Sequence, residues 1–376
     1  MTALTDAERL KFGLLADGLA MTDEATAYIT AHNGDRPLTP ADYASTSGVI
    51  LVLDGDVWVN APIAAHNANF VVSPPYRLVR DGGGLAVEGQ GLSARASFWL
   101  PPRFHGRRNA DGEEYNSYAF THTDRVRVSP IEGCAFTCTF CDLPYEFRYR
   151  AKSVAGLVDV VDVAMTDAVQ PAHHILISGG TPRPADYPYV RKVYEAVITG
   201  FRGTPVDIMM VPIEEVMDLP WLASLGVAEI SVNLELWAER EARVRMPRKY
   251  KQGRDHYLSY LSRAASELGG ERVRSMLMAG LEPLEDTLAG VEAIASRGCV
   301  PVLSPFRPDP STPLRNHPVP SASFLTEAYL GAREITQRLG VPLGPSCIPC
   351  AHNTLTLPST HGNGDASRSY GQPHVV

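Results

Sequence analysis

From about Val126 onward, the sequence alternates short β-branched runs with amphipathic stretches of helical length. Such an alternation is typical of βα units whose strands pair in parallel. The expected strands cover 125–128, 174–178, 206–211, 229–234, 274–279 and 300–305, and the expected helices cover 154–169, 189–201, 214–225, 254–268, 284–297 and 323–339. Six such units are two fewer than a closed eight-stranded barrel requires. We therefore predict an α/β fold, a partial and open (β/α)6 TIM-like barrel, with its functional residues at the carboxyl ends of the strands.

The first third of the chain does not follow this alternation. The expected elements there are helices at 6–19 and 23–31, a strand-like run at 49–60 and a hairpin at 76–88 that turns on Asp81-Gly82-Gly83-Gly84. We predict three parts: an N-terminal accessory α+β domain at 1–120, the barrel at 121–345 and a C-terminal segment at 346–376. The last eighteen residues, from Ser359, are polar and contain several glycines, so we expect a mobile tail.

Composition narrows the class of protein. Hydrophobic residues make up 44% of the chain and charged residues 20%, which indicates a globular protein and excludes intrinsic disorder. The net charge of -8 gives no overall field that would recruit nucleic acid or an anionic membrane, so we expect neither as a partner. The first residues carry no basic and apolar leader pattern, and no apolar run reaches the length of a membrane span, so we expect a cytoplasmic location. Six cysteines are too few for a disulfide framework and indicate metal or redox chemistry.

Three cysteines follow the first expected strand directly. Cys134, Cys138 and Cys141 form a C-x3-C-x2-C array on an expected loop. Thiolates are soft ligands that favour iron–sulfur clusters or zinc. A cubane cluster held by three cysteines keeps its fourth iron open to an added ligand. A zinc knuckle completed by His122 or Asp142 is the alternative.

This spacing, with the aromatic Phe140 just before the third cysteine, resembles the cluster motif of the radical S-adenosylmethionine (SAM) superfamily. The resemblance covers about 123–357 and is nearest to the branch of biotin synthase, [FeFe]-hydrogenase maturases and methylornithine synthase, because the segment 301–314 is similar to the sixth-strand ending of that branch, where a proline-rich loop follows the strand. It implies a [4Fe–4S] cluster on Cys134, Cys138 and Cys141 whose open iron chelates SAM. It also implies an external electron donor such as flavodoxin or ferredoxin, and a 5′-deoxyadenosyl radical that abstracts a substrate hydrogen.

Other segments resemble the SAM-binding motifs of the family. Gly179 and Gly180 match a glycine pair after the second strand, with Thr181 where an acidic residue is frequent. Gly280 and Glu282 match the motif of the fifth strand. The resemblance implies SAM contacts from Phe140, Ser178, Gly179, Gly180, Thr181, Ser231, Asn233, Glu235, Arg254 and Gly280. Arg254 is chosen from a basic run at 243–254 that can equally be a solvated face or a nucleic-acid contact.

Cys347 and Cys350 form a separate C-x2-C motif after the last expected helix. We expect the chain to climb from that helix to the upper rim of the barrel, which makes this pair a candidate for catalysis. Three interpretations remain open: ligands of an auxiliary metal or iron–sulfur cluster together with His352, a thiol hydrogen donor or redox pair, and a structural zinc site or disulfide. Cys299 begins the sixth expected strand and is expected to pack as a small apolar residue.

The predicted function is that of a radical SAM enzyme acting on a small polar metabolite. Arg183, Met210, Arg307 and Asp309 lie near expected strand ends and are candidate substrate contacts. The charged members of this set suggest an amino-acid-like or carboxylated substrate. Radical modification of an RNA or a peptide is an alternative, and a non-catalytic zinc-binding protein is an alternative of another class.

Overall fold

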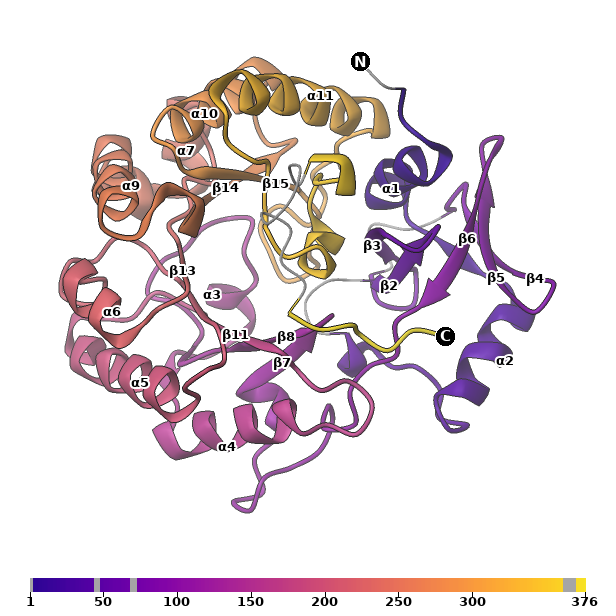
Figure 1. Ribbon diagram of the computed structural model, residues 1–376, viewed down its shortest axis with the longest axis horizontal. Coiled ribbons are helices and arrows are strands. Elements are labelled where there is room, and N and C mark those ends of the chain that lie inside the picture. The colour runs from indigo at the N-terminus through magenta and orange to yellow at the C-terminus, as the bar shows by residue number, and fades with distance from the viewer. Residues whose placement is uncertain (1–2, 44–47, 68–72, 361–369) are drawn as a thin grey trace.

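A curled sheet of seven strands dominates the computed structural model, which describes residues 3–43, 48–67, 73–360 and 370–376 (Figure 1). The strand order is β15-β14-β13-β12-β11-β8-β7. Its parallel strands are β8 (Arg125–Val128), β11 (His174–Ser178), β12 (Val206–Met209), β13 (Glu229–Ser231), β14 (Val273–Ala279) and β15 (Val300–Pro305). β7 (Ala119–His122) pairs with β8 in the antiparallel sense and was not predicted. The six parallel strands confirm the open, partial (β/α)6 barrel.

Helices surround the outer face of this sheet in Figure 1. They are α4 (Val154–Met165), α5 (Tyr187–Gly200), α6 (Leu219–Leu225), α9 (Arg254–Leu268), α10 (Leu284–Ala295) and α11 (Ala322–Leu339). Each covers the sheet with an apolar stripe, as Val190, Val193 and Val197 of α5 do, all of them fully buried. α6 begins later than expected because the Asp218 carboxylate accepts from Trp221 N and caps the helix there.

Several short elements connect these units. They are α3 (Leu143–Glu146), α7 (Glu239–Arg245), α8 (Pro247–Gln252), β9 (Ile131–Glu132), β10 (Arg150–Ala151), and the 3-10 turns η1 (Pro40–Asp42), η3 (Tyr115–Ser117), η4 (Pro184–Asp186), η5 (Gly270–Arg272), η6 (Pro349–Asn353) and η7 (Pro358–Thr360). α7 and α8 contain most of the basic run and were not predicted. Pro247 begins the second of these two helices and separates it from the first.

The N-terminal part forms a six-stranded sheet of order β1-β4-β5-β6-β2-β3. Its elements are α1 (Asp6–Asp17), β1 (Ala20–Met21), α2 (Asp23–His32), β2 (Gly48–Leu53), β3 (Val57–Pro62), β4 (Arg77–Asp81), β5 (Gly84–Gly89) and β6 (Leu92–Phe98). The expected hairpin at 76–88 is confirmed, with Asp81 opposite Gly84. The expected single run at 49–60 is wrong, because Asp54 and Gly55 adopt φ angles of 47° and 94° and turn the chain into a β2–β3 hairpin.

The C-terminal segment lies between the barrel and the N-terminal sheet, where Figure 1 draws it in yellow. Leu355 N donates to Leu303 O of β15, while the buried Lys11 of α1 donates to Ala351 O over 2.9 Å. Phe98 and Val376 exchange two backbone hydrogen bonds, so the last residues are anchored and the expected mobile tail is wrong for 370–376. Residues 359 and 360 of that tail belong to the 3-10 turn η7, and 361–369 lie outside the described residues. The division at 120 and 345 stays a prediction.

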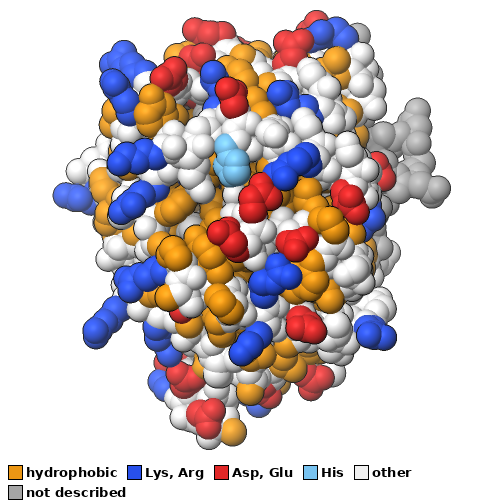
Figure 2. Space-filling model, turned by 90° about the vertical axis from the view of Figure 1, so that its left-hand side faces the viewer, with side chains coloured by type: hydrophobic (Ala, Val, Ile, Leu, Met, Phe, Trp, Pro, Cys, Tyr) orange, Lys and Arg blue, Asp and Glu red, His pale blue; other side chains and the backbone are white. Residues whose placement is uncertain are grey.

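Figure 2 shows the side of the molecule formed by the helices at the left of Figure 1, among them α5, α6 and α9. Acidic and basic side chains both occur on this face, with apolar side chains between them. In the described part of the chain, no helix combines the length and apolar character that crossing a membrane requires.

Candidate active site

The C-x3-C-x2-C cysteines lie on the loop that follows β8 and β9. Cys138 is 8% exposed, and Cys134 and Cys141 are partly exposed. The backbone N–H groups of Phe136 and Thr181 donate to Sγ of Cys134 over 3.3 and 3.1 Å. Donors aimed at a sulfur atom stabilise the thiolate, which is the form that binds metal. Burial raises the pKa of Cys138 to about 11, so binding of metal at this sulfur must displace the proton.

The cysteine loop rests on the residues that follow β11. Ala135 N donates to Thr181 O over 3.0 Å, which pairs the loop with the Gly179-Gly180-Thr181 segment. A Cβ atom added to Gly180 would lie 1.7 Å from Gly133 O. Only glycine permits so close an approach of two backbones. Gly180 therefore positions the cysteine loop, a role that the resemblance did not indicate.

The polar residues expected on the fourth strand are only partly on it, because β13 ends at Ser231. Ser231 Oγ donates to Asn233 Oδ1 over 2.8 Å, and this oxygen also accepts from Met276 N over 3.2 Å. Glu235 lies beyond the strand with a φ of 67°, an uncommon value for a residue other than glycine. Its Oε1 accepts from Lys249 Nζ over 2.9 Å.

Lys249 belongs to the same basic run as Arg254 but was not predicted as a SAM contact. Its Nζ also donates to Asn233 O over 3.1 Å. Burial disfavours the ammonium, but the Glu235 carboxylate holds the pKa of Lys249 above its usual value. The same ammonium opposes the effect of burial on the pKa of Cys138. Lys249 therefore supplies a fixed positive charge beside the cysteine loop.

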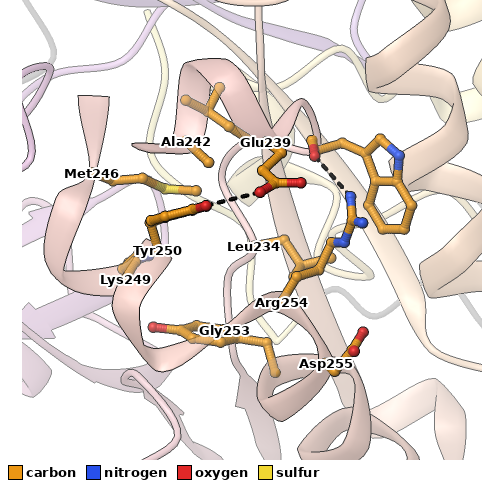
Figure 3. Close-up of a pocket in the computed structure, with 12 residues that line it drawn as sticks. Leu234, Glu239, Ala242, Met246, Lys249, Tyr250, Gly253, Arg254 and Asp255 are labelled. Atoms are coloured by element: carbon orange, nitrogen blue, oxygen red, sulfur yellow. Dashed lines mark hydrogen bonds between the residues drawn. The ribbon is translucent and has the colours of Figure 1, made fainter. Parts of the chain in front are cut away.

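Arg254 and Lys249 both line a cavity of about 300 Å³ between the residues that follow β13 and α7, α8 and α9 (Figure 3). Arg254 Nη1 donates to Trp237 O over 3.0 Å, and the Arg254 guanidinium carbon lies 4.1 Å from the centroid of the Trp237 ring. Across the cavity, Tyr250 donates to Glu239 over 2.8 Å. Arg254 is thus engaged by Trp237, whereas Lys249 is the basic side chain paired with Glu235.

Gly280 and Glu282 of the fifth-strand motif act on the conformation of the backbone. Gly280 has a φ of 103°, and a Cβ atom there would lie 2.7 Å from the Pro320 side chain. Glu282 accepts from Trp237 N and Ala238 N over 2.8 and 2.7 Å, directly before α7. Glu282 therefore fixes the start of the helix that follows.

A cavity of about 330 Å³ occupies the interior of the barrel. Alternate side chains of the parallel strands point into it: Arg125, Arg127, Leu176, Ser178, Met209, Ser231, Arg274, Met276, Met278, Val302 and Ser304. At the carboxyl ends of the strands it reaches Phe140 and Asp142 of the cysteine loop, and at the other end it reaches Cys350 and His352. The cavity therefore connects the cysteine loop to the interior of the barrel.

Two of the four expected substrate residues line this cavity, namely Arg307 and Asp309. Arg307 donates to Asn60 O of β3 over 2.6 Å, and burial lowers its pKa to about 9. Arg183 is exposed and lies over the Tyr149 ring, outside the cavity. Met210 packs in the hydrophobic core, and the neighbouring Met209 lines the cavity instead.

Two buried histidines line the cavity, and the sequence predicted each of them only as an alternative metal ligand: His122 in a zinc knuckle and His352 in an auxiliary metal site. Burial lowers the pKa of His352 to about 3 and holds the pKa of His122 well below its usual value, so both rings are neutral. His352 Nδ1 lies 3.0 Å from Pro349 O, and the two rings stack with centroids 6.1 Å apart.

Cys347 and Cys350 are not at the upper rim, which corrects the sequence-based placement. Both are 2% exposed and lie beside Asp124 and His174, at the amino ends of β8 and β11. The chain pairs with β15 at Gly344, leaves it, and returns to it at Asn353 and Leu355, so the cysteines stay at the level where the strands begin. They lie at the opposite end of the barrel from the first cysteine motif.

The family model described as Radical SAM superfamily matches residues 128–293. Residues 128–293 therefore form a radical SAM domain. Solved structures with low similarity include HydG, a maturase of the [FeFe]-hydrogenase, at 14% identity and a TM-score of 0.47, covering 58% of this chain and 50% of HydG. HydG from Carboxydothermus hydrogenoformans has 15% identity and a TM-score of 0.47, with coverage of 59% and 54%. A radical SAM methyltransferase from Sphaerobacter thermophilus has 19% identity and a TM-score of 0.45, with coverage of 74% and 78%. The chain spans about half the length of the two HydG structures, and no curated protein matches it.

Members of the radical SAM superfamily use a [4Fe–4S] cluster and SAM. The residues present fit the cluster: three cysteines on one loop follow the first parallel strand, and two backbone N–H groups point at the sulfur of Cys134. Cys347 and Cys350 form a further pair of free thiols that can hold an auxiliary metal.

Glu282 gives the radical SAM domain a predicted pH dependence. Burial raises the pKa of Glu282 from 4.5 to about 7, against the effect of its two backbone donors. Between these two values the folded state holds a proton that the unfolded state has lost, so stability falls as the pH rises. The decrease is at most about 3 kcal/mol. We expect Glu282→Gln to remove this component in urea unfolding curves from pH 4.5 to 8.

The exposed Glu267 of α9 provides the matched control. Glu267→Gln leaves the buried carboxyl group of Glu282 in place, so this variant should keep the decrease in stability that Glu282 causes. If the difference between the wild type and Glu282→Gln does not change across this range, Glu282 does not carry a raised pKa.

Proposed function

We propose that this chain is a radical SAM enzyme that binds its cluster through Cys134, Cys138 and Cys141 and abstracts hydrogen from a small metabolite with a carboxylate or other anionic group, held in the central cavity. The observation that carries the proposal is the continuity of that cavity. It begins beside Phe140 and Asp142 on the cysteine loop and continues between the strands to Arg125 and Arg274. A small molecule in it would lie with one end near the cluster.

The charges of the cavity support a substrate with an anionic group. Arg274 is neutralised by Asp207 and Glu229 over 3.1 and 2.9 Å. Arg125 and Arg127, in contrast, form no ion pair with any other described residue. Arginine recognises carboxylate and phosphate groups through paired donors.

The negatively charged side chains of the cavity lie nearer the cysteine loop than these arginines do. Asp142 and Asp309 line the same cavity there. An amino acid-like substrate would thus find carboxylates for its ammonium group near the cluster and guanidinium groups for its carboxylate deeper inside.

When bound, the cluster supplies the electron that cleaves SAM and generates the 5′-deoxyadenosyl radical. The SAM contacts proposed are the residues of the family motifs, among them Gly179, Ser231 and Asn233. Lys249 joins Arg254 as a candidate partner of the SAM carboxylate, because its ammonium is fixed beside Cys138. We further propose a cytoplasmic enzyme with flavodoxin or ferredoxin as its electron donor.

Isotope transfer tests this function. The enzyme is reconstituted anaerobically with iron and sulfide, reduced with dithionite and supplied with SAM and deuterated amino acids, hydroxy acids or sugar phosphates. Deuterium found in 5′-deoxyadenosine identifies the substrate. Transfer from an RNA or a peptide alone would support the alternative reaction, and absence of 5′-deoxyadenosine with every addition would contradict a radical SAM reaction.

Arg127→Gln tests the anion-binding role. Loss of a charge-assisted hydrogen bond of about 1.5–3 kcal/mol should raise KM for the identified substrate by about ten- to a hundredfold, with a smaller change in kcat. The exposed Arg202 is the matched control, and Arg202→Gln should leave KM unchanged. An unchanged KM in Arg127→Gln would show that the substrate charge is bound elsewhere.

A further inference from the structure

Four side chains capable of binding metal meet at the floor of the barrel. Asp124 comes from the turn between β7 and β8, His174 begins β11, and Cys347 and Cys350 come from the C-terminal segment. One ligand atom from each lies within 4.8 Å of the others. All four residues are at most 2% exposed. Within the described residues, His174 Nδ1 has no hydrogen-bond partner.

The distances between these atoms match the edges of a tetrahedron around one ion. Bonds of about 2.3 Å from zinc to sulfur and about 2.0–2.2 Å to nitrogen or oxygen give S–N and S–O edges of about 3.5 Å. Cys350 Sγ lies 3.5 Å from His174 Nε2, and Cys347 Sγ lies 3.5 Å from Asp124 Oδ1. Cys350 Sγ lies 3.8 Å from the same carboxylate oxygen.

The same distances argue against an iron–sulfur cluster here. A cluster places several iron and sulfide atoms between its protein ligands and holds them farther apart than one ion does. His352, the third ligand considered from the sequence, is also outside the group, because its Nδ1 faces Pro349 O. The ligands found instead are His174 and Asp124.

The hydrogen bonds and the charge of these four residues favour binding of a cation. Cys350 N donates to Cys347 Sγ over 3.3 Å, which favours the thiolate form. Asp124 forms no ion pair with a lysine or an arginine anywhere in the described ranges. A buried carboxylate beside two thiols is costly unless a positive charge compensates it.

We propose that Asp124, His174, Cys347 and Cys350 bind one zinc ion. Four protein ligands leave no open position, which is the arrangement of a structural zinc site. The ion joins the first two parallel strands to the C-terminal segment and closes the floor of the cavity that Cys350 lines. Cys347 and Cys350 are then metal ligands and do not donate hydrogen to a substrate radical.

Metal analysis of the full chain tests the site. Anaerobically purified protein should contain about one zinc per chain in addition to the iron of its cluster. X-ray absorption at the zinc edge should show two sulfur ligands at about 2.3 Å and two nitrogen or oxygen ligands at about 2.0–2.2 Å. A zinc content near zero, or a shell of four sulfurs, would overturn the proposal.

Variants separate this site from the radical SAM cluster. Cys134→Ala/Cys138→Ala/Cys141→Ala should lose its iron and keep its zinc, whereas iron retained by this variant would indicate an auxiliary cluster and overturn the proposal. His174→Ala and Cys350→Ser should each lower zinc at least tenfold, and Cys299→Ser, which changes a buried cysteine outside the group, should not. If His174→Ala and Cys350→Ser keep their zinc, the ligand assignment is wrong. The absorption measurement on the wild type does not depend on how well these variants fold.

Discussion

Cys138→Ala is expected to abolish reductive cleavage of SAM and to remove most of the iron from the protein. Cys138 is the most buried of the three loop cysteines and packs against Leu236 and Phe306. With one sulfur lost, two thiolates remain for a cluster that needs three protein ligands and one open iron. The measurements are iron per chain, charge-transfer absorption after anaerobic reconstitution, and 5′-deoxyadenosine formed with dithionite.

Cys299→Ser is the control for this substitution. Cys299 is fully buried at the start of β15, and its Sγ lies 3.6 Å from Leu261 O, a carbonyl to which serine can also donate. This variant should keep the iron and the cleavage of SAM. Wild-type amounts of 5′-deoxyadenosine in Cys138→Ala would refute the assignment of the loop as the cluster site.

The sequence predicted the barrel because short β-branched runs alternate with amphipathic stretches of helical length, which is the pattern of βα units. The strands at 125–128, 174–178 and 300–305 have the observed bounds. β12 and β13 end earlier than expected because Met210 and the residues after Ser231 continue the apolar pattern without continuing the strand. Composition does not distinguish a strand from the extended loop that follows it.

The cysteine loop was predictable because its ligands are close together in the sequence. Asp124 and His174 were not found, since neither is near Cys347 in the sequence. One observation could have found them: a ligand-type residue lies at the amino end of each of the first two expected strands, and parallel pairing places these ends side by side. His174 is paired with Arg125, the residue after Asp124.

Lys249 was missed for a different reason. Within a basic run, charge alone does not distinguish a buried residue from a solvated one. Lys249 differs from the other basic residues because α7 and α8 turn its side chain toward Glu235. The break between them at Pro247 was visible in the sequence, but the side of α8 that faces the barrel was not.

Gly180→Ala should destabilise the protein and reduce the iron bound to it. The added Cβ atom would lie 1.7 Å from Gly133 O and 2.9 Å from Cys134 Cα, so backbone rather than a flexible side chain must move. Displacement of the loop also weakens the bonds from Thr181 N to Cys134 Sγ and from Ala135 N to Thr181 O. Overpacking and two lost hydrogen bonds together cost about 2–5 kcal/mol. We expect a lower midpoint of thermal unfolding and less iron per chain after reconstitution.

Gly200→Ala is the matched control, because the last residue of α5 has no atom within 4 Å of an added Cβ. Alanine is favoured over glycine in a helix by up to about 1 kcal/mol, so this variant should be as stable as the wild type or more stable. The comparison also separates two roles of Gly180. If Gly180→Ala keeps its stability and its iron but binds SAM weakly, this glycine serves SAM, as the family motif implies. If stability and iron fall together, it serves the cysteine loop, because the clash at Gly133 exists before SAM is added.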